Sequence, residues 1–207
     1  MNFHLEESPV KLNIPKQDAS GYAILCLHGR NQTPAFMQDI LKKMGWENIP
    51  VILPTASEKA WYPKGFMADL NENLPDLDYS LETVEHYHKE LNDLGYSDEN
   101  IILMGFSQGA CLMAQYALLH PNRYKSIIIF TGGYIGQDEI DWKFKGDFEE
   151  TPVYITTSEI DEWVPVSRTK ETANEFNRLN AKVELKIFEK RPHEVSEEEI
   201  KATANYL

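Results

Sequence analysis

An apolar run that ends at a serine between two glycines, and then resumes as a helix, is the feature that most constrains this chain. Residues 101–104 are apolar and begin with two isoleucines, which is typical of a strand buried on both faces of a sheet. After Gln108, apolar residues recur at helical spacing until His120-Pro121 ends the pattern. The chain therefore changes from strand to helix within a few residues of Ser107.

A strand that turns at once into a helix forces the residue between them into a strained backbone conformation. Gly105 and Gly109 leave room for such a conformation at Ser107. Gly-x-Ser-x-Gly between a strand and a helix is the pattern of a nucleophile elbow, which exposes the serine hydroxyl above the sheet and places the next backbone N–H at the helix N-terminus. The pentapeptide alone also fits an ordinary strand-to-helix turn, so the interpretation depends on the flanking elements.

Strand-like and helix-like segments alternate along the whole chain. Besides 101–104, strands are predicted at 22–27, 49–53, 126–130, 153–157 and 183–187, with an edge strand within 3–14. Helices are predicted after a cap at Thr33, after a cap at Ser80, over 166–179 and after the capping-box sequence 196–199. Strands that alternate with helices and lack polar alternation predict an α/β fold, a doubly wound, mostly parallel sheet, in a single domain over residues 1–207.

Charge and composition exclude several classes of partner. The 207 residues carry a net charge of −13, so the phosphates of nucleic acids and anionic membrane surfaces would be repelled. No apolar run approaches a membrane span, and the first residues lack the pattern of a secretory signal. We expect no nucleic-acid partner, no stable membrane insertion and a cytoplasmic location. Cys26 and Cys111 are expected to be buried free thiols, with a bridge between them left open.

A serine hydroxyl is a poor nucleophile near neutral pH, so hydrolysis needs a base within hydrogen-bond reach and a carboxylate that orients the base. Among six histidines, His193 lies in the loop between the last predicted strand and the last helix, and Asp161 follows the preceding strand. The order Ser107, Asp161, His193 is that of α/β-hydrolase triads. The alternatives are a surface histidine near a helix start, and Glu159 or Glu162 in place of Asp161.

Negative charge on an attacked carbonyl oxygen also needs fixed hydrogen-bond donors. The backbone N–H of Gln108, at the helix start, is one candidate for this oxyanion hole. The backbone N–H of Arg30, just beyond His28-Gly29 on the neighbouring strand-end loop, is the second. His28-Gly29 also fits a simple turn, in which the histidine braces the loop by hydrogen bonding and transfers no proton.

The long connection from Thr55 to Tyr79 is of the kind that usually forms a functional loop. We expect three of its aromatic residues, Trp61, Tyr62 and Phe66, to bind substrate as a wall for an acyl group, with Met67 beside them. The equally weighted alternative is that these side chains only hold the loop against the body of the protein.

With these residues, the chain resembles the phospholipase/carboxylesterase family of α/β-hydrolases, which includes the acyl-protein thioesterases. The resemblance runs from about Tyr22 to the C-terminus. It is carried by Leu27-His28-Gly29 as the oxyanion loop, Gly105-Phe106-Ser107-Gln108-Gly109-Ala110 as the elbow, Asp161 and His193 as the other triad positions, and Trp61-Tyr62-Pro63 as a loop bordering the active site. Two positions depart from the usual pattern of the family: Asn31 after Arg30, and Glu162-Trp163 after Asp161. These departures bear on which substrate is preferred and leave the expected hydrolytic chemistry unchanged. The resemblance implies an α/β-hydrolase fold in a minimal form without a large cap domain.

The sequence therefore predicts a serine hydrolase that cleaves carboxylic esters of small or medium acyl groups through an acyl-enzyme on Ser107. The alternative among hydrolases is an acyl-protein thioesterase or lysophospholipase. The alternative of another class is a catalytically inactive binding module with the same fold. No cofactor and no metal are expected, the expected partner is a small-molecule ester or thioester substrate, and a homodimer is left open.

Overall fold

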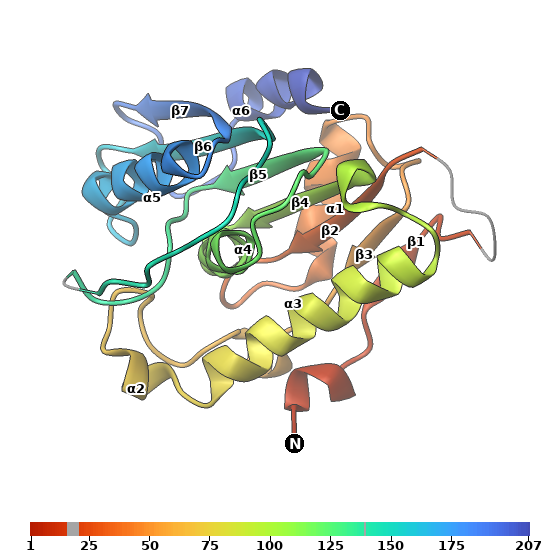
Figure 1. The fold of residues 1–207 in the computed structure, drawn as a ribbon, viewed down its shortest axis with the longest axis horizontal. Coiled ribbons are helices and arrows are strands. Elements are labelled where there is room, and N and C mark those ends of the chain that lie inside the picture. Colours follow the sequence, from red (N-terminus) through yellow and green to blue (C-terminus); the bar gives the residue numbers. More distant parts are fainter. Residues whose placement is uncertain (16–20, 139) are drawn as a thin grey trace.

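The computed structural model describes residues 1–15, 21–138 and 140–207, and these residues form a seven-stranded sheet with helices on both faces (Figure 1). The strands are β1 (Val10–Leu12), β2 (Ala23–Leu27), β3 (Val51–Leu53), β4 (Ile101–Phe106), β5 (Ser126–Phe130), β6 (Pro152–Ser158) and β7 (Lys182–Phe188). The α-helices are α1 (Pro34–Lys43), α2 (Leu70–Asn73), α3 (Asp76–Asp93), α4 (Gln108–Leu119), α5 (Val166–Arg178) and α6 (Glu197–Ala202). Short 3₁₀ helices are η1 (Phe3–Glu6), η2 (Ser57–Lys59), η3 (Asp98–Asn100) and η4 (Thr203–Tyr206).

The strands are ordered β1-β3-β2-β4-β5-β6-β7 across the sheet. The edge strand β1 runs antiparallel to β3, and the pairs from β3 to β7 are parallel. The predicted doubly wound, mostly parallel sheet is therefore confirmed, and within the described residues no connection forms a separate cap over it. Because the strands are parallel, the loops that follow β2, β4, β5, β6 and β7 all open at one edge.

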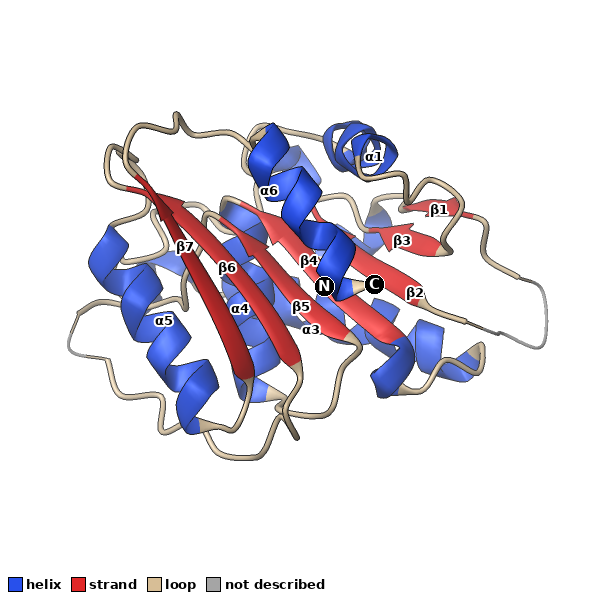
Figure 2. Ribbon diagram, turned by 90° about the horizontal axis from the view of Figure 1, so that it is seen from above, coloured by secondary structure: helices blue, strands red, loops and turns tan. Residues whose placement is uncertain are grey.

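Two apolar cores, one on each face, explain why the central strands lack polar alternation. From β4, Ile102 and Met104 pack with residues of α1 on one face, whereas Ile101 and Leu103 pack with α3 and α4 on the other. Figure 2 shows this layering, with α1 and α6 on one side of the sheet and α4 on the other. Both cysteines are buried and free, Cys26 on β2 and Cys111 on α4, as expected. Strands covered on both faces are apolar at every position.

The start of α3 differs from the sequence prediction. The helix begins at Asp76, so Asp76 and Asp78, which the sequence analysis placed in the long connection from Thr55 to Tyr79, lie in its first turn, where the helix dipole favours carboxylates. Ser80, predicted as the N-cap, lies inside the helix and is fully buried. Its hydroxyl donates to the carbonyl oxygen of Trp61 and lies 3.0 Å from Nε2 of His4. The cap prediction was wrong because the hydroxyl has distant partners, which a local pattern does not reveal.

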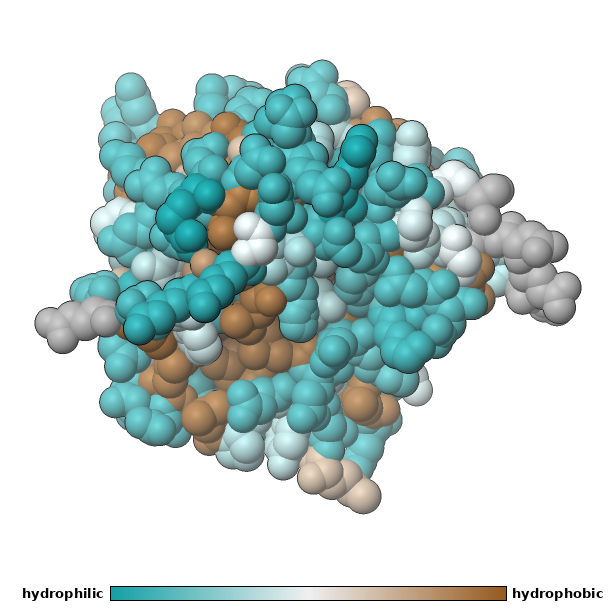
Figure 3. Space-filling view, viewed as in Figure 1, coloured by the Kyte–Doolittle hydropathy of each residue, from teal (hydrophilic) through white to brown (hydrophobic). Residues whose placement is uncertain are grey.

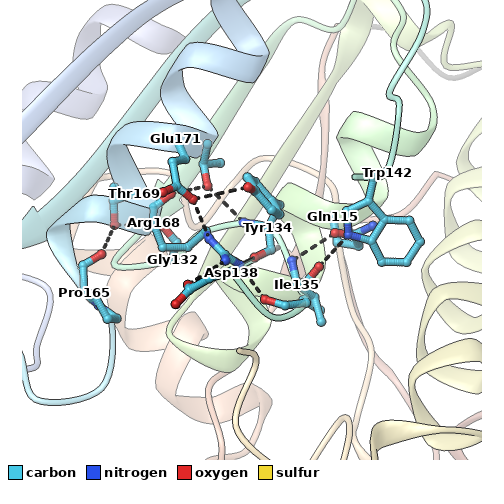
Figure 4. Close-up of polar contacts among 12 residues, drawn as sticks. Gln115, Gly132, Tyr134, Ile135, Asp138, Trp142, Pro165, Arg168, Thr169 and Glu171 are labelled. Atoms are coloured by element: carbon cyan, nitrogen blue, oxygen red, sulfur yellow. Dashed lines mark hydrogen bonds and ion pairs between the residues drawn. The ribbon is translucent and has the colours of Figure 1, made fainter. Parts of the chain in front are cut away.

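The loop that follows β5 is anchored to α5 by a buried arginine. The guanidinium of Arg168 donates to the carbonyl oxygens of Tyr134 at 3.1 Å and Gly136 at 2.6 Å, and its Nε lies 2.9 Å from Glu171 (Figure 4). The same guanidinium stacks on the ring of Tyr134. This network satisfies backbone carbonyls that no sheet or helix pairs, and so holds a long loop against the body.

Polar residues cover most of the face seen in Figure 3, and hydrophobic residues reach the surface in patches, one at the upper left and one below and to the left of the centre. Among residues 1–15, 21–138 and 140–207, no helix has both the length and the apolar character needed to cross a bilayer.

Candidate active site

Ser107 lies between β4 and α4 in the conformation expected of an elbow. Its backbone has φ 55° and ψ −121°, and its N–H donates to the carbonyl oxygen of Phe130 at 3.0 Å. A Cβ on Gly105 would lie 2.5 Å from the carbonyl oxygen of Gly109, and a Cβ on Gly109 would lie 2.4 Å from that of His28. Only glycine fits at both positions, so the two glycines permit the tight strand-to-helix turn that raises the serine above the sheet.

Three loops bring Ser107, His193 and Asp161 into one hydrogen-bonded chain. Nε2 of His193 lies 2.8 Å from Oγ of Ser107, and Nδ1 lies 2.7 Å from Oδ2 of Asp161. A carboxylate accepts only, so Nδ1 carries the proton and Nε2 is left to accept from the serine hydroxyl. Glu159 and Glu162, the alternative acids, have exposed side chains. The arrangement is the one that proton abstraction from a serine requires.

The environment of Asp161 keeps its carboxylate charged. Burial alone would raise its pKa, but hydrogen bonds from His193 and from the backbone N–H groups of Val164 and Trp163 outweigh burial, so the pKa lies below the ordinary value. The two backbone groups donate to Oδ1 at 2.9 and 3.0 Å, which leaves Oδ2 for the imidazole. The carboxylate therefore orients both the imidazole and the loop that carries Trp163.

The loop after β2 approaches the elbow closely. A Cβ on Gly29 would lie 3.1 Å from Cβ of Ser107, which places the backbone just before Arg30 against the serine. Gln108 is the first residue of α4, where backbone N–H groups lack helical partners. The two residues predicted to donate to an oxyanion thus lie on segments that border Ser107, and their role remains a prediction.

His28 braces this loop. Its Nδ1 lies 2.8 Å from the carbonyl oxygen of Gly29, and its Nε2 accepts from the backbone N–H of Ala56 at 3.1 Å. Burial lowers its pKa, so the ring is neutral near pH 7. Both ring nitrogens have backbone partners, which fits the bracing alternative considered for His28-Gly29.

A cavity of about 490 Å³ opens above Ser107 and His193. It is lined by Arg30, Asn31, Tyr62, Pro63, Lys64, Gly65, Phe66, Ser107, Gln108, Cys111, Trp163, Val164 and His193. Two of the three predicted wall residues, Tyr62 and Phe66, are in this lining. The volume is that of a site for a small organic molecule, and the walls are mainly apolar.

Trp61, the third predicted wall residue, does not line the cavity. It is fully buried, and its indole N–H donates to the carbonyl oxygen of His28 at 2.8 Å. The centroid of its ring lies 5.5 Å from that of the His4 imidazole and 5.2 Å from that of the His28 imidazole. The expectation of substrate contact is corrected, because Trp61 fastens the loop to the body, which was the alternative for this residue.

The side chains of Arg30 and Gln108 have a function that sequence reasoning missed. The guanidinium of Arg30 donates to the carbonyl oxygens of residues 62–64 at 2.5–2.9 Å. The amide of Gln108 accepts from the N–H of Trp61 at 3.0 Å and donates to the carbonyl oxygen of Tyr62 at 2.8 Å. The residues predicted as backbone oxyanion donors therefore also hold the cavity wall in place.

Trp163 and Cys111 are further lining residues that the sequence analysis did not assign to the site. Trp163 is 71% exposed and lies at the cavity, two residues after Asp161. The sequence contained one sign of this position, because Glu162-Trp163 departs from the family pattern directly after the triad acid. Cys111 lies one helical turn after Ser107, and burial raises the pKa of its thiol to about 12, so it is uncharged. Within the part of the chain that the structure describes, no group of three or more His, Cys, Asp or Glu side chains is arranged to hold a metal ion.

Comparison with known proteins extends the similarity over nearly the whole chain. The model of the family described as Phospholipase/Carboxylesterase matches residues 12–207, a range that contains Ser107, Asp161 and His193. The acyl-protein thioesterase 1 of Saccharomyces cerevisiae is 23% identical over 197 residues, which are 91% of this chain and 86% of the yeast protein. The acyl-protein thioesterase 1 of Kluyveromyces lactis is 24% identical over 142 residues, 67% of this chain but only 62% of that protein. A crystal structure of a phospholipase/carboxylesterase from Dyadobacter fermentans matches with a TM-score of 0.91 and 38% identity, covering 95% of this chain and 94% of that chain.

Proposed function

The chain belongs to the phospholipase/carboxylesterase family of hydrolases, and on this premise we propose that it cleaves carboxylic esters through an acyl-enzyme on Ser107. The observation that carries the proposal is the hydrogen-bonded chain from Ser107 through His193 to Asp161. A folded but inactive binding module would have no need for an imidazole within 2.8 Å of a half-buried serine at an elbow.

In the proposed reaction, Nε2 of His193 takes the proton of Ser107 as Oγ attacks the ester carbonyl. The backbone N–H groups of Gln108 and Arg30 donate to the oxygen that becomes negatively charged. His193 then gives its proton to the leaving alcohol, and the acyl group stays on the serine. Water then attacks the acyl carbonyl with His193 again as base, the bond to Oγ of Ser107 breaks, and His193 returns its proton to the serine as the carboxylic acid leaves. Asp161 stabilises the imidazolium in both steps.

The cavity supports small or medium acyl groups as substrates. Its volume of about 490 Å³ holds a small molecule, and Tyr62, Phe66 and Val164 give it apolar walls. The runner-up activity is removal of acyl groups from proteins or lysophospholipids. The names of the two yeast relatives support the first of these substrates, and the family description, which includes phospholipases, supports the second. The net charge of −13 disfavours approach to anionic membranes and so favours esters free in solution.

Substitution of the nucleophile tests the mechanism. Ser107→Ala should abolish hydrolysis of p-nitrophenyl butyrate and labelling by a fluorophosphonate, with an unchanged unfolding temperature. Ser97→Ala is the matched control, because Ser97 is exposed before the amino end of β4, at the edge away from the elbow. Retained turnover in Ser107→Ala would refute the assignment.

A substrate panel tests the acyl preference. We expect kcat/KM to be highest between acetyl and octanoyl esters and to fall for palmitoyl esters, and oxygen esters to be preferred over the matching thioesters. A maximum at palmitoyl, or a clear preference for thioesters, would favour the runner-up activity.

A further inference from the structure

Arg191 is a buried arginine two residues before His193. Its side chain is part of the loop between β7 and α6, and the residue is only 5% exposed. One terminal nitrogen of its guanidinium, Nη1, donates to the carbonyl oxygen of Pro192 at 2.9 Å and also to that of Glu194. The two carbonyls that flank His193 in sequence are therefore held by the same nitrogen.

The other terminal nitrogen connects this loop to the elbow. Nη2 of Arg191 donates to Oγ1 of Thr131 at 2.6 Å. Thr131 directly follows Phe130, whose carbonyl oxygen accepts the backbone N–H of Ser107 at 3.0 Å. The guanidinium thus links the backbone around His193 to the end of β5, which also holds the backbone of Ser107.

A buried carboxylate balances the charge of Arg191. Oε2 of Glu199 lies 3.4 Å from Nε of Arg191, and Glu199 is fully buried. Glu199 also accepts from the N–H of Ser196 at 2.7 Å and from the hydroxyl of Thr156 at 2.5 Å. These bonds attach the start of α6 to β6, so the ion pair joins the loop that carries His193 to α6 and, through Glu199, to β6.

We propose that Arg191 is a positioning residue that fixes the imidazole of His193 relative to Ser107, an inference that rests on the proposed function. A base must lie within about 2.6–3.2 Å of the hydroxyl that it deprotonates. A displacement of about 1 Å costs on the order of 100-fold in rate. The planar fork of an arginine reaches two carbonyls, a hydroxyl and a carboxylate at once, and a lysine offers one ammonium in their place.

The test measures two esters of one acyl group with different leaving groups. Butyrate esters of p-nitrophenol and of ethanol are hydrolysed by wild type, Arg191→Lys and Arg191→Met. The acylation step controls kcat/KM for both esters. Departure of ethanol needs a proton from His193, whereas p-nitrophenolate is stable enough to leave without one. In the two Arg191 variants we expect kcat to fall about 10- to 100-fold while KM stays within about threefold of wild type. We expect the fall in kcat/KM to be at least about fivefold larger for the ethyl ester than for the p-nitrophenyl ester.

Two sets of controls separate positioning from loss of stability. Arg168→Lys removes a buried guanidinium of α5 that also binds a carboxylate and two backbone carbonyls, but these carbonyls belong to the loop after β5, which carries no triad residue. It should lower the unfolding temperature as much as Arg191→Lys and leave kcat unchanged. Thr131→Ala removes one partner of Arg191 and should lower kcat/KM about three- to tenfold, whereas Thr131→Ser keeps the hydroxyl and should match wild type.

The outcomes are distinct. A wild type without Ser107-dependent hydrolysis would remove the proposed function, and with it this inference. With an active wild type, the inference is overturned if Arg191→Lys keeps kcat within twofold. It is also overturned if kcat/KM of the Arg191 variants falls equally for both esters and only as much as the fraction of protein that reacts with a fluorophosphonate. Such a result would mean that fewer molecules are folded and that the folded ones have an unchanged site. Should neither Arg191 variant fold, the Thr131 pair decides, and equal activity of Thr131→Ala and Thr131→Ser would overturn it.

Discussion

Trp61 should contribute strongly to stability without determining which acyl group is cleaved. Its side chain is fully buried, and truncation of a buried tryptophan to alanine costs about 3–5 kcal/mol. Against a total stability of about 5–15 kcal/mol for a typical domain, Trp61→Ala would leave a marginal protein. Trp61→Phe keeps most of the ring but removes the indole N–H, and the carbonyl oxygen of His28 then loses its donor. An unpaired buried carbonyl costs about 1–3 kcal/mol, so we expect a loss in this range.

The specificity of the Trp61→Phe variant should remain that of the wild type, because Trp61 is not in the cavity lining. Phe66 is in the lining, so Phe66→Ala enlarges the cavity and should shift the preferred acyl chain to greater length. The two substitutions therefore distinguish a residue that supports the cavity wall, Trp61, from a residue that contacts the substrate, Phe66. Both are changes of aromatic side chains in the same loop, which makes each a control for the other.

The assay combines urea unfolding with hydrolysis of acetyl, butyryl, octanoyl and palmitoyl p-nitrophenyl esters. Trp61→Phe should lower the unfolding midpoint and leave the ratios of kcat/KM along the series within twofold of wild type. Phe66→Ala should change those ratios. A chain-length profile that moves in Trp61→Phe and stays fixed in Phe66→Ala would show that the assignment of the two side chains is reversed.

Three further predictions concern the elbow, the buried histidines and the triad carboxylate. Gly109→Ala places a Cβ 2.4 Å from the carbonyl oxygen of His28, so α4 must move away from β2; we expect a loss of more than about 2 kcal/mol in urea unfolding, and an unchanged midpoint would contradict the close packing. Burial lowers the pKa of His4 and of His28 below 6.5, so the unfolded chain takes up these protons first and stability should fall as the pH drops below about 6.5. Equal urea midpoints at pH 7.5 and 5.5 would speak against this linkage. Asp161→Asn should lower kcat about 1,000- to 10,000-fold with little loss of stability, because an amide favours the wrong tautomer of His193. A fall of less than tenfold in steady-state assays would show that the carboxylate is not needed.

The sequence by itself determined the elements and the order of the site residues. A buried parallel strand is apolar throughout, and an elbow needs two glycines around its serine, so β4, α4 and Ser107 follow from local composition. Asp161 and His193 could be chosen because parallel strands open their following loops at one edge. These inferences need only the character of neighbouring residues and the direction of the strands.

Only the tertiary structure decided which side chains meet. Ser80 looks like a helix cap, yet its hydroxyl binds Trp61 across 19 residues of sequence. Trp61 looks like a wall residue but lies beneath the wall, and Arg191 looks like a loop cation but holds the backbone around His193. Each of these roles depends on hydrogen bonds between segments that are distant in sequence. Such partners leave no periodic pattern, because they are set by how loops of particular lengths pack over the finished sheet.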